Sequence, residues 1–167
     1  NNDGLLDIIV LDMLPEEEKI RKQSGGEDDY ELYKLKLEHG YGYQFVRNTL
    51  QLNLGGGIFS EIGRLAGIYA TDWSWSPLFC DVDNDGWVDL LIVGEFMPIT
   101  CFKNNDGKTF TPLAKESLGH TSGWWNSLTA GDFDKDGDTD YIAGNLGLNT
   151  RYRGSTKEPL CIYASDY

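Results

Sequence analysis

The chain matches itself, without a gap, when it is shifted by 51 residues. The matching positions include turn, aromatic and acidic residues rather than one residue type. A period of about 50 residues is typical of stacked or radial β-units such as propeller blades. The matched pairs are Asn53/Asn104, Gly56/Gly107, Phe59/Phe110, Trp73/Trp124, Ser76/Ser127, Asp81/Asp132, Asp83/Asp134, Asp85/Asp136, Gly86/Gly137 and Asp89/Asp140.

Short strands are predicted inside each repeat. The runs DIIVLD, DLLIVG and DYIAGN each follow an acidic stretch and are rich in apolar and β-branched residues. The segment ITCFKNNDGKTFTPL predicts a hairpin that turns at Asn105-Asp106-Gly107, and LQLNLGGGIFSEI is its counterpart one period earlier. Several short strands separated by turns indicate an all-β fold, here a partial β-propeller over residues 1–167. The predicted repeats span about 1–58, 59–109 and 110–167.

The first repeat carries extra residues. Residues 3–7 match residues 85–89 at an offset of 82 instead of 51, so about 31 additional residues lie between positions 12 and 43. We predict that segment 12–43 is an insertion with one short helix, which carries an apolar stripe and stops near Gly40. A surface loop is the alternative. The stripe would contain Tyr30, Tyr33, Leu35 and Leu37.

The acidic residues are concentrated rather than spread. The net charge is −13, and eleven of the 27 acidic residues lie in segments 1–7, 81–89 and 132–140. Asp and Asn also cap turns, so the alternative is that these aspartates only stabilise turns. However, four carboxylates within nine residues repel one another unless a cation is bound between them. Calcium prefers such oxygen ligands on a loop turned by glycine. We therefore predict calcium sites, with side chains at positions 1, 3, 5 and 9 of each loop and the carbonyl at position 7.

The ligand positions follow from this spacing. Position 12 is Val10, Ile92 or Ala143, which are apolar, so neither a helical calcium sensor nor a dockerin-like loop fits. The first loop lacks its opening residue in this chain and should bind weakly or not at all. The predicted ligands are Asp81, Asp83, Asp85, Trp87 and Asp89 in the second loop; Asp132, Asp134, Asp136, Asp138 and Asp140 in the third; and Asn1, Asp3, Leu5 and Asp7 in the partial first loop.

Several classes of function are disfavoured. The acidic charge argues against nucleic acid as a partner. No apolar run is long enough to span a membrane. Cys80, Cys101 and Cys161 form no CxxC pair, and we expect Cys80 and Cys101 to be small core residues. The sequence offers no common catalytic motif, and His39 and His120 are expected to be structural.

The pattern D-x-D-x-D-G-x-x-D, followed by an apolar strand, resembles the FG-GAP or VCBS repeats of integrin-α-like β-propellers. Residues 81–94 and 132–144 carry it fully, and residues 1–10 carry its end. Segments such as GWWNSLTAGDFDKDGDTDYIAGNLGLN look like the CRTAC/UnbV-type branch, and LDMLPEE is similar to large bacterial proteins of the Bacteroidetes group. The resemblance implies that the chain is a fragment of a larger propeller and that the loop aspartates bind calcium. It also implies export to the cell surface or beyond, with association with an outer membrane as one form of this location.

Three functions remain open. A calcium-stabilised extracellular binding module would take a glycan or a protein as its ligand, with Trp75 and Trp125 as candidate contacts. The propeller part of a polysaccharide-active surface enzyme is the second. A purely architectural scaffold segment is the third. We expect Trp73 and Trp124, which repeat at the same phase, to pack between blades, whereas Trp75 and Trp125 are free for a ligand.

Overall fold

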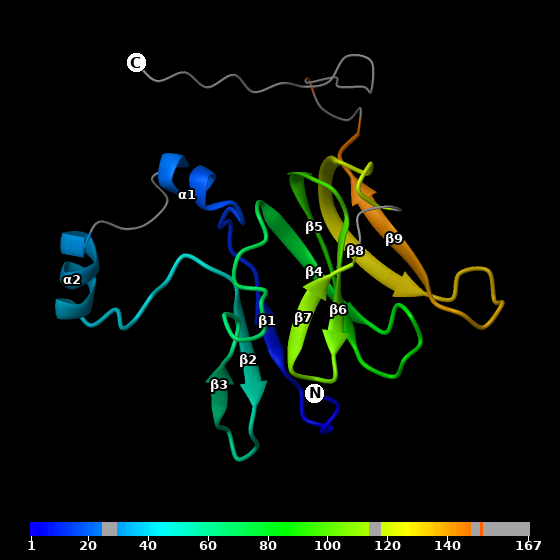
Figure 1. Ribbon diagram of the computed structural model, residues 1–167, viewed down its shortest axis with the longest axis horizontal. Coiled ribbons are helices and arrows are strands. Elements are labelled where there is room, and N and C mark those ends of the chain that lie inside the picture. The colour runs from blue at the N-terminus through cyan, green and yellow to red at the C-terminus, as the bar shows by residue number, and fades with distance from the viewer. Residues whose placement is uncertain (25–29, 114–117, 148–150, 152–167) are drawn as a thin grey trace.

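The described part of the chain is built of antiparallel strands and two short helices, in a computed structural model that describes residues 1–24, 30–113, 118–147 and 151 (Figure 1). This architecture confirms the predicted all-β fold. In chain order, the elements are β1 (Ile8–Val10), α1 (Glu18–Ser24), α2 (Tyr30–Glu38), β2 (Thr49–Asn53), β3 (Phe59–Glu61), β4 (Ser74–Cys80), β5 (Asp89–Met97), β6 (Thr100–Asn105), β7 (Thr109–Pro112), β8 (Gly123–Gly131) and β9 (Asp140–Asn145).

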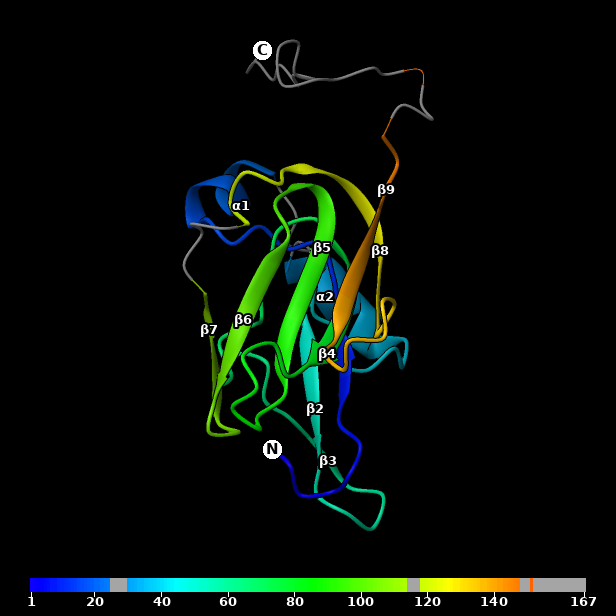
Figure 2. The same ribbon diagram turned by 90° about the vertical axis from the view of Figure 1, so that its right-hand side faces the viewer.

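Strands β4 to β7 form a four-stranded meander in chain order, as in one propeller blade. Strands β1, β2 and β3 form a separate sheet, and β8 pairs with β9 and with the far end of β5. Figure 2 shows β6, β5, β8 and β9 side by side. The described strands form no closed ring. The chain thus presents one four-stranded unit between two shorter ones.

The 51-residue period returns in the strand register. In β4–β5 the register shifts between Ser74 and Ser76, and in β8–β9 it shifts between Trp125 and Ser127, which is the same place one period later. Such a shift is a β-bulge, which bends a strand and sharpens its twist. Gly94 faces the first bulge, where an added Cβ would lie 1.9 Å from the carbonyl oxygen of Trp73. The irregular feature therefore repeats together with the regular strands.

Strand β5 is buried on both faces. Leu90 and Ile92 pack with Leu50, Ile68 and neighbouring residues in the main core cluster, on the side of the β1–β2–β3 sheet. Leu91 lines a cavity with Leu128 and Tyr141 on the opposite side. A strand covered on both faces needs a continuous apolar run rather than alternation, and DLLIV supplies it.

Both predicted hairpins are present. Strands β6 and β7 turn through Asp106 and Gly107, whose φ angles of 52° and 71° lie in the left-handed region. Glycine adopts this region without strain and aspartate tolerates it, which explains the Asp-Gly sequence. Strands β2 and β3 turn through Gly56 and Gly57, which also have positive φ.

The segment between β1 and β2 contains two helices, where the sequence predicted one. The predicted helix is α2, and its stripe is only partly covered: Tyr33 and Leu37 are half-buried, whereas Tyr30 and Leu35 are exposed. The additional helix α1 has an ion pair from Lys22 to Glu18 at 2.7 Å. Neither helix has the length and apolar character needed to cross a bilayer. The limits of the insertion and of the repeats remain predictions.

Candidate metal centre

The three acidic loops share one backbone conformation. Position 4 of each loop is Asn2, Asn84 or Lys135, with φ between 57° and 66°, and position 6 is Gly4, Gly86 or Gly137, with φ between 82° and 98°. Two left-handed residues so close together fold the loop back on itself. Glycine at position 6 makes the second of these residues free of strain. The side chains at positions 1, 3 and 5 consequently face one another.

The second and third loops each bring three aspartates together. Each aspartate of a triad offers one carboxylate oxygen, and these oxygens lie within 4.8 Å of one another. Position 1 is held in place by the glycine nitrogen, at 2.9 Å in the second loop and 3.2 Å in the third. Hard oxygen donors that converge on a flexible loop suit calcium, so both donor sets fit the ion. The triads are Asp81, Asp83 and Asp85, and Asp132, Asp134 and Asp136.

The position 9 aspartates lie outside these triads. Asp89 is fully buried, and its two oxygens accept hydrogen bonds from the backbone nitrogens of Val82 at 3.1 Å and Asn104 at 2.8 Å. Asp140 accepts a bond from the Phe133 nitrogen at 2.9 Å, which repeats the Val82 bond one period later. These aspartates close the loop onto its own backbone. Their ligation of an ion, like that of the Trp87 and Asp138 carbonyls, remains a prediction.

Lys103 distinguishes the second loop from the third. It projects from β6, and its ammonium group contacts Asp83 and lies 2.9 Å from Asp85 Oδ2. Hydrogen bonds to Asp83 and Asp85 raise the pKa of Lys103 above its ordinary value. The same Lys103 contact is the main reason that the pKa of Asp85 is lowered, with the Trp87 N–H as the second cause. A protein cation therefore neutralises part of this triad.

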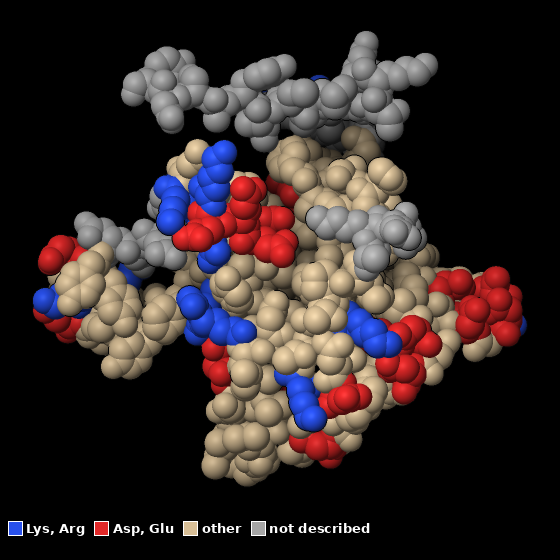
Figure 3. Space-filling view, viewed as in Figure 1, with Lys and Arg blue, Asp and Glu red and all other residues tan. Residues whose placement is uncertain are grey.

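The third triad is held by hydrogen bonds within its own loop. In the described residues, no lysine or arginine forms an ion pair with Asp132, Asp134 or Asp136. The backbone N–H of Asp138 lowers the pKa of Asp136, whereas a side-chain hydrogen bond with Asp136 raises the pKa of Asp138. The third loop also projects from the molecule at the right of Figure 1, and acidic side chains gather at the same edge of Figure 3.

The first loop is partial, as the sequence indicated. Asp3 accepts hydrogen bonds from Asn1 Nδ2 at 2.9 Å and from the Leu5 nitrogen at 2.8 Å, while Asp7 accepts one from the Asn53 nitrogen at 2.8 Å. The Leu5 contact recurs in both complete loops, and the Asn53 contact recurs in the second. Asn2 Nδ2 also donates to the carbonyl of Gly86 at 2.6 Å, so the first and second loops touch.

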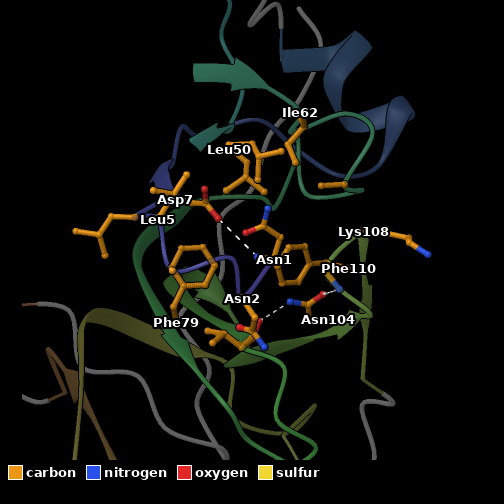
Figure 4. Close-up of a pocket in the computed structure, with 16 residues that line it drawn as sticks. Asn1, Asn2, Leu5, Asp7, Leu50, Ile62, Phe79, Asn104, Lys108 and Phe110 are labelled. Carbon is orange, nitrogen blue, oxygen red and sulfur yellow. Dashed lines mark hydrogen bonds and ion pairs between the residues drawn. The ribbon is translucent and has the colours of Figure 1, made fainter. Parts of the chain in front are cut away.

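A cavity of about 360 Å³ lies between the first loop and the β4–β7 blade. Its apolar lining includes Leu50, Ile62, Phe79 and Phe110, and Lys108 directs its ammonium group away from the cavity (Figure 4). Neither this cavity nor the one beside Leu91 is lined by the candidate ligand residues Trp75 and Trp125.

Those tryptophans lie at the other end of the blade. Because β4 and β8 run toward the acidic loops, their first residues lie at the opposite end, where β5 also ends. Trp75 is 51% exposed there, whereas Trp125 is half-buried and donates its indole N–H to the Thr121 carbonyl at 2.8 Å. Phe96 and Trp124 bring their ring centroids to 5.3 Å at this end. Trp73, which we expected to pack between blades, is 39% exposed.

Phe96 is held in an unusual conformation. Its φ of 59° lies in the left-handed region, which is costly for an aromatic residue and often marks a functional surface. No sequence pattern marks this residue, because its left-handed φ coincides with the register shift between β5 and β8. The expected core cysteine Cys101 is buried, Cys80 is half-buried, and both thiols are free; Cys161 lies outside the described residues.

The fold and the repeated loops define a protein built from propeller-type blades. The profile of the FG-GAP-like repeat family matches residues 1–92 and 81–143. The chain therefore belongs to the FG-GAP-like repeat family. No curated protein matches it.

Proposed function

We propose that this chain is a calcium-stabilised propeller module that binds a glycan or protein ligand outside the cell or at its surface. The observation that supports it most is the pair of aspartate triads, spaced by one repeat and held by matching hydrogen bonds. Calcium would neutralise each triad and fix the connection between two strands, β4–β5 in one case and β8–β9 in the other. The ion thus has a structural role.

The proposed location follows from the expected affinity. A loop with exposed carboxylates and few fixed ligands should bind calcium with a Kd on the order of 0.1–1 mM, as extracellular modules do. Such a site fills only where free calcium is plentiful. We also propose that the chain belongs to the CRTAC/UnbV-type branch and is bacterial, because segments of its sequence resemble those proteins.

Calcium titration tests the structural role. The protein should bind two ions in calorimetry, and chelation should lower its Tm. Asp85→Ala and Asp136→Ala should each remove one ion, whereas Glu38→Ala, on the exposed face of α2, should keep both. A folded protein with no binding heat and no change in Tm contradicts the proposal.

The aromatic end of the blade is the proposed ligand surface. Exposed tryptophan faces stack on sugar rings or pack against protein, and Trp75 offers such a face at the end of the blade where Phe96 and Trp124 pair. Binding on a glycan array in calcium should be lost in Trp75→Ala and kept in Tyr43→Ala, an exposed aromatic residue in the segment between α2 and β2. Release of reducing ends from polysaccharide would instead support the enzyme, and the absence of both signals would support the scaffold.

A further inference from the structure

Lys103 contacts the aspartate triad of the second loop. Lys103 reaches the second triad from β6, twenty residues away in sequence from Asp83. One period earlier the equivalent residue is Leu52, so the lysine belongs to this blade and is not shared with the preceding one. The third triad has no such ion pair among the described residues. Within the described residues, a lysine from a neighbouring strand therefore distinguishes the second triad from the third.

We propose that Lys103 acts as a built-in competitor for calcium, so that the second loop fills at higher calcium concentration than the third. This inference rests on the calcium sites proposed above. The ammonium group contacts Asp83 and Asp85, which supply two of the three convergent oxygens. An ion that takes those oxygens at 2.3–2.6 Å must break both contacts first.

Displacement of the lysine is feasible because the site is open. The Lys103 side chain is about one-third exposed, and so are Asp83 and Asp85. Its flexible stem can therefore carry the ammonium group into water when an ion arrives. Each exposed ion pair that is lost should weaken calcium binding by up to about fivefold. Together the two contacts predict that the second loop binds about three- to tenfold more weakly than it would without Lys103.

The same contacts give the second loop a cation when calcium is absent. The ammonium group neutralises part of the carboxylate repulsion that would otherwise open the triad. No described lysine or arginine pairs with the third triad, whose loop is held by internal hydrogen bonds such as Asp138 N to Asp136 Oδ1 at 3.1 Å. Removal of calcium should therefore disturb the third loop more than the second.

Site-resolved binding tests the proposal. Asp136→Ala leaves only the second loop complete, and Trp87 within that loop sensitises the luminescence of terbium, which replaces calcium. In this background, calcium should displace terbium about three- to tenfold more effectively after Lys103→Met, which keeps the stem and removes the charge. Lys103→Arg, which keeps the charge, should stay close to the parent. Lys108→Ala, on the same hairpin but without contact to the triad, is the matched control.

The outcomes separate this inference from the function on which it rests. If neither loop of the unaltered protein binds calcium, the proposed function fails. If both loops bind calcium but Lys103→Met leaves the second loop unchanged or weaker, the competition is wrong and the calcium module stands. The competition is also wrong if Lys108→Ala tightens binding as much as Lys103→Met does, because a general loss of positive charge would then be the cause.

Discussion

Asp89 accepts a hydrogen bond from the backbone nitrogen of Asn104, with 2.8 Å between Asn104 N and Asp89 Oδ1. Asp7 and Asn53 form the same bond at the same distance in the preceding unit. In both units the asparagine also donates its side-chain nitrogen to the carbonyl just before the aspartate, at 2.8 Å in one and 3.1 Å in the other. The ends of the first and second acidic loops are therefore tied to β2 and β6, respectively.

The side chain of Asn104 should be worth about 2 kcal/mol of unfolding free energy. Asn104→Ala leaves the Val88 carbonyl and the Gly107 nitrogen without their partner, and Asn104 is buried, so water does not replace it readily. Denaturant unfolding in saturating calcium measures the loss. Asn105→Ala, which loses only longer bonds to two threonine hydroxyls, should cost less than half as much. Equal losses of unfolding free energy in the two variants would mean that the Asn104 side-chain hydrogen bonds contribute no more to stability than those of Asn105.

The β5 core should respond strongly to truncation. Ile92 is fully buried in the cluster between the first sheet and the β4–β7 blade, so Ile92→Ala should lower the free energy of unfolding by about 2–5 kcal/mol. Ile142→Ala in β9 is the matched control. Since Ile142 is 50% exposed, its truncation should cost about 1 kcal/mol or less. Similar losses in the two variants would contradict the assignment of the core.

The bulge opposite Gly94 should not tolerate a side chain. In Gly94→Ala the new Cβ would meet the backbone of Trp73 and Ser74, which cannot move without shifting β4. We expect a loss of about 1–3 kcal/mol or more, measured as a lower Tm. Gly144→Ala is a milder change, because the nearest atom is the hydroxyl of Ser127 at 2.5 Å and that side chain can rotate. If Gly144→Ala is the more damaging variant, the described bulge geometry is wrong.

Cys101 should be inert in the folded protein. Burial raises the pKa of its thiol to about 12, with the Asp89 carboxylate as a further cause. The thiol is protonated below that pH, and only the thiolate reacts quickly with iodoacetamide. At pH 8, mass spectrometry should find Cys101 unmodified in the native protein and fully alkylated after denaturation. Alkylation of native Cys101 at the denatured rate would show that the core is open at this point.

The repeat made much of the fold predictable. Strands β5 and β9 begin at Asp89 and Asp140, where the acidic pattern ends and the apolar run begins, and the Asp106-Gly107 turn follows from local chemistry. The triads were also predictable, because positions 1, 3 and 5 of a loop turned by glycine converge. Asn53 and Asn104 match each other in the repeat alignment. Their hydrogen bonds to the acidic loops could not be predicted, because the sequence does not show which strand lies beside each loop.

The remaining features depend on tertiary contacts. Helix α1 has a single apolar residue, Ile20, so no periodicity marks it; Arg21 from this helix lies over the ring of Tyr69, 5.7 Å from its centroid. The contact of Lys103 with Asp83 joins a strand to a loop and follows from the β5–β6 pairing. The left-handed φ of Phe96 likewise arises where β5 changes partner from β4 to β8.

The double burial of β5 has a practical consequence. Successive residues of this one strand report on two different sheet contacts: Leu90 and Ile92 face the β1–β2–β3 side, whereas Leu91 faces β8 and β9. Spectroscopic probes at adjacent positions of β5 can therefore report separately on the two contacts. One probe detects separation of the preceding sheet, and its neighbour detects separation of the following one.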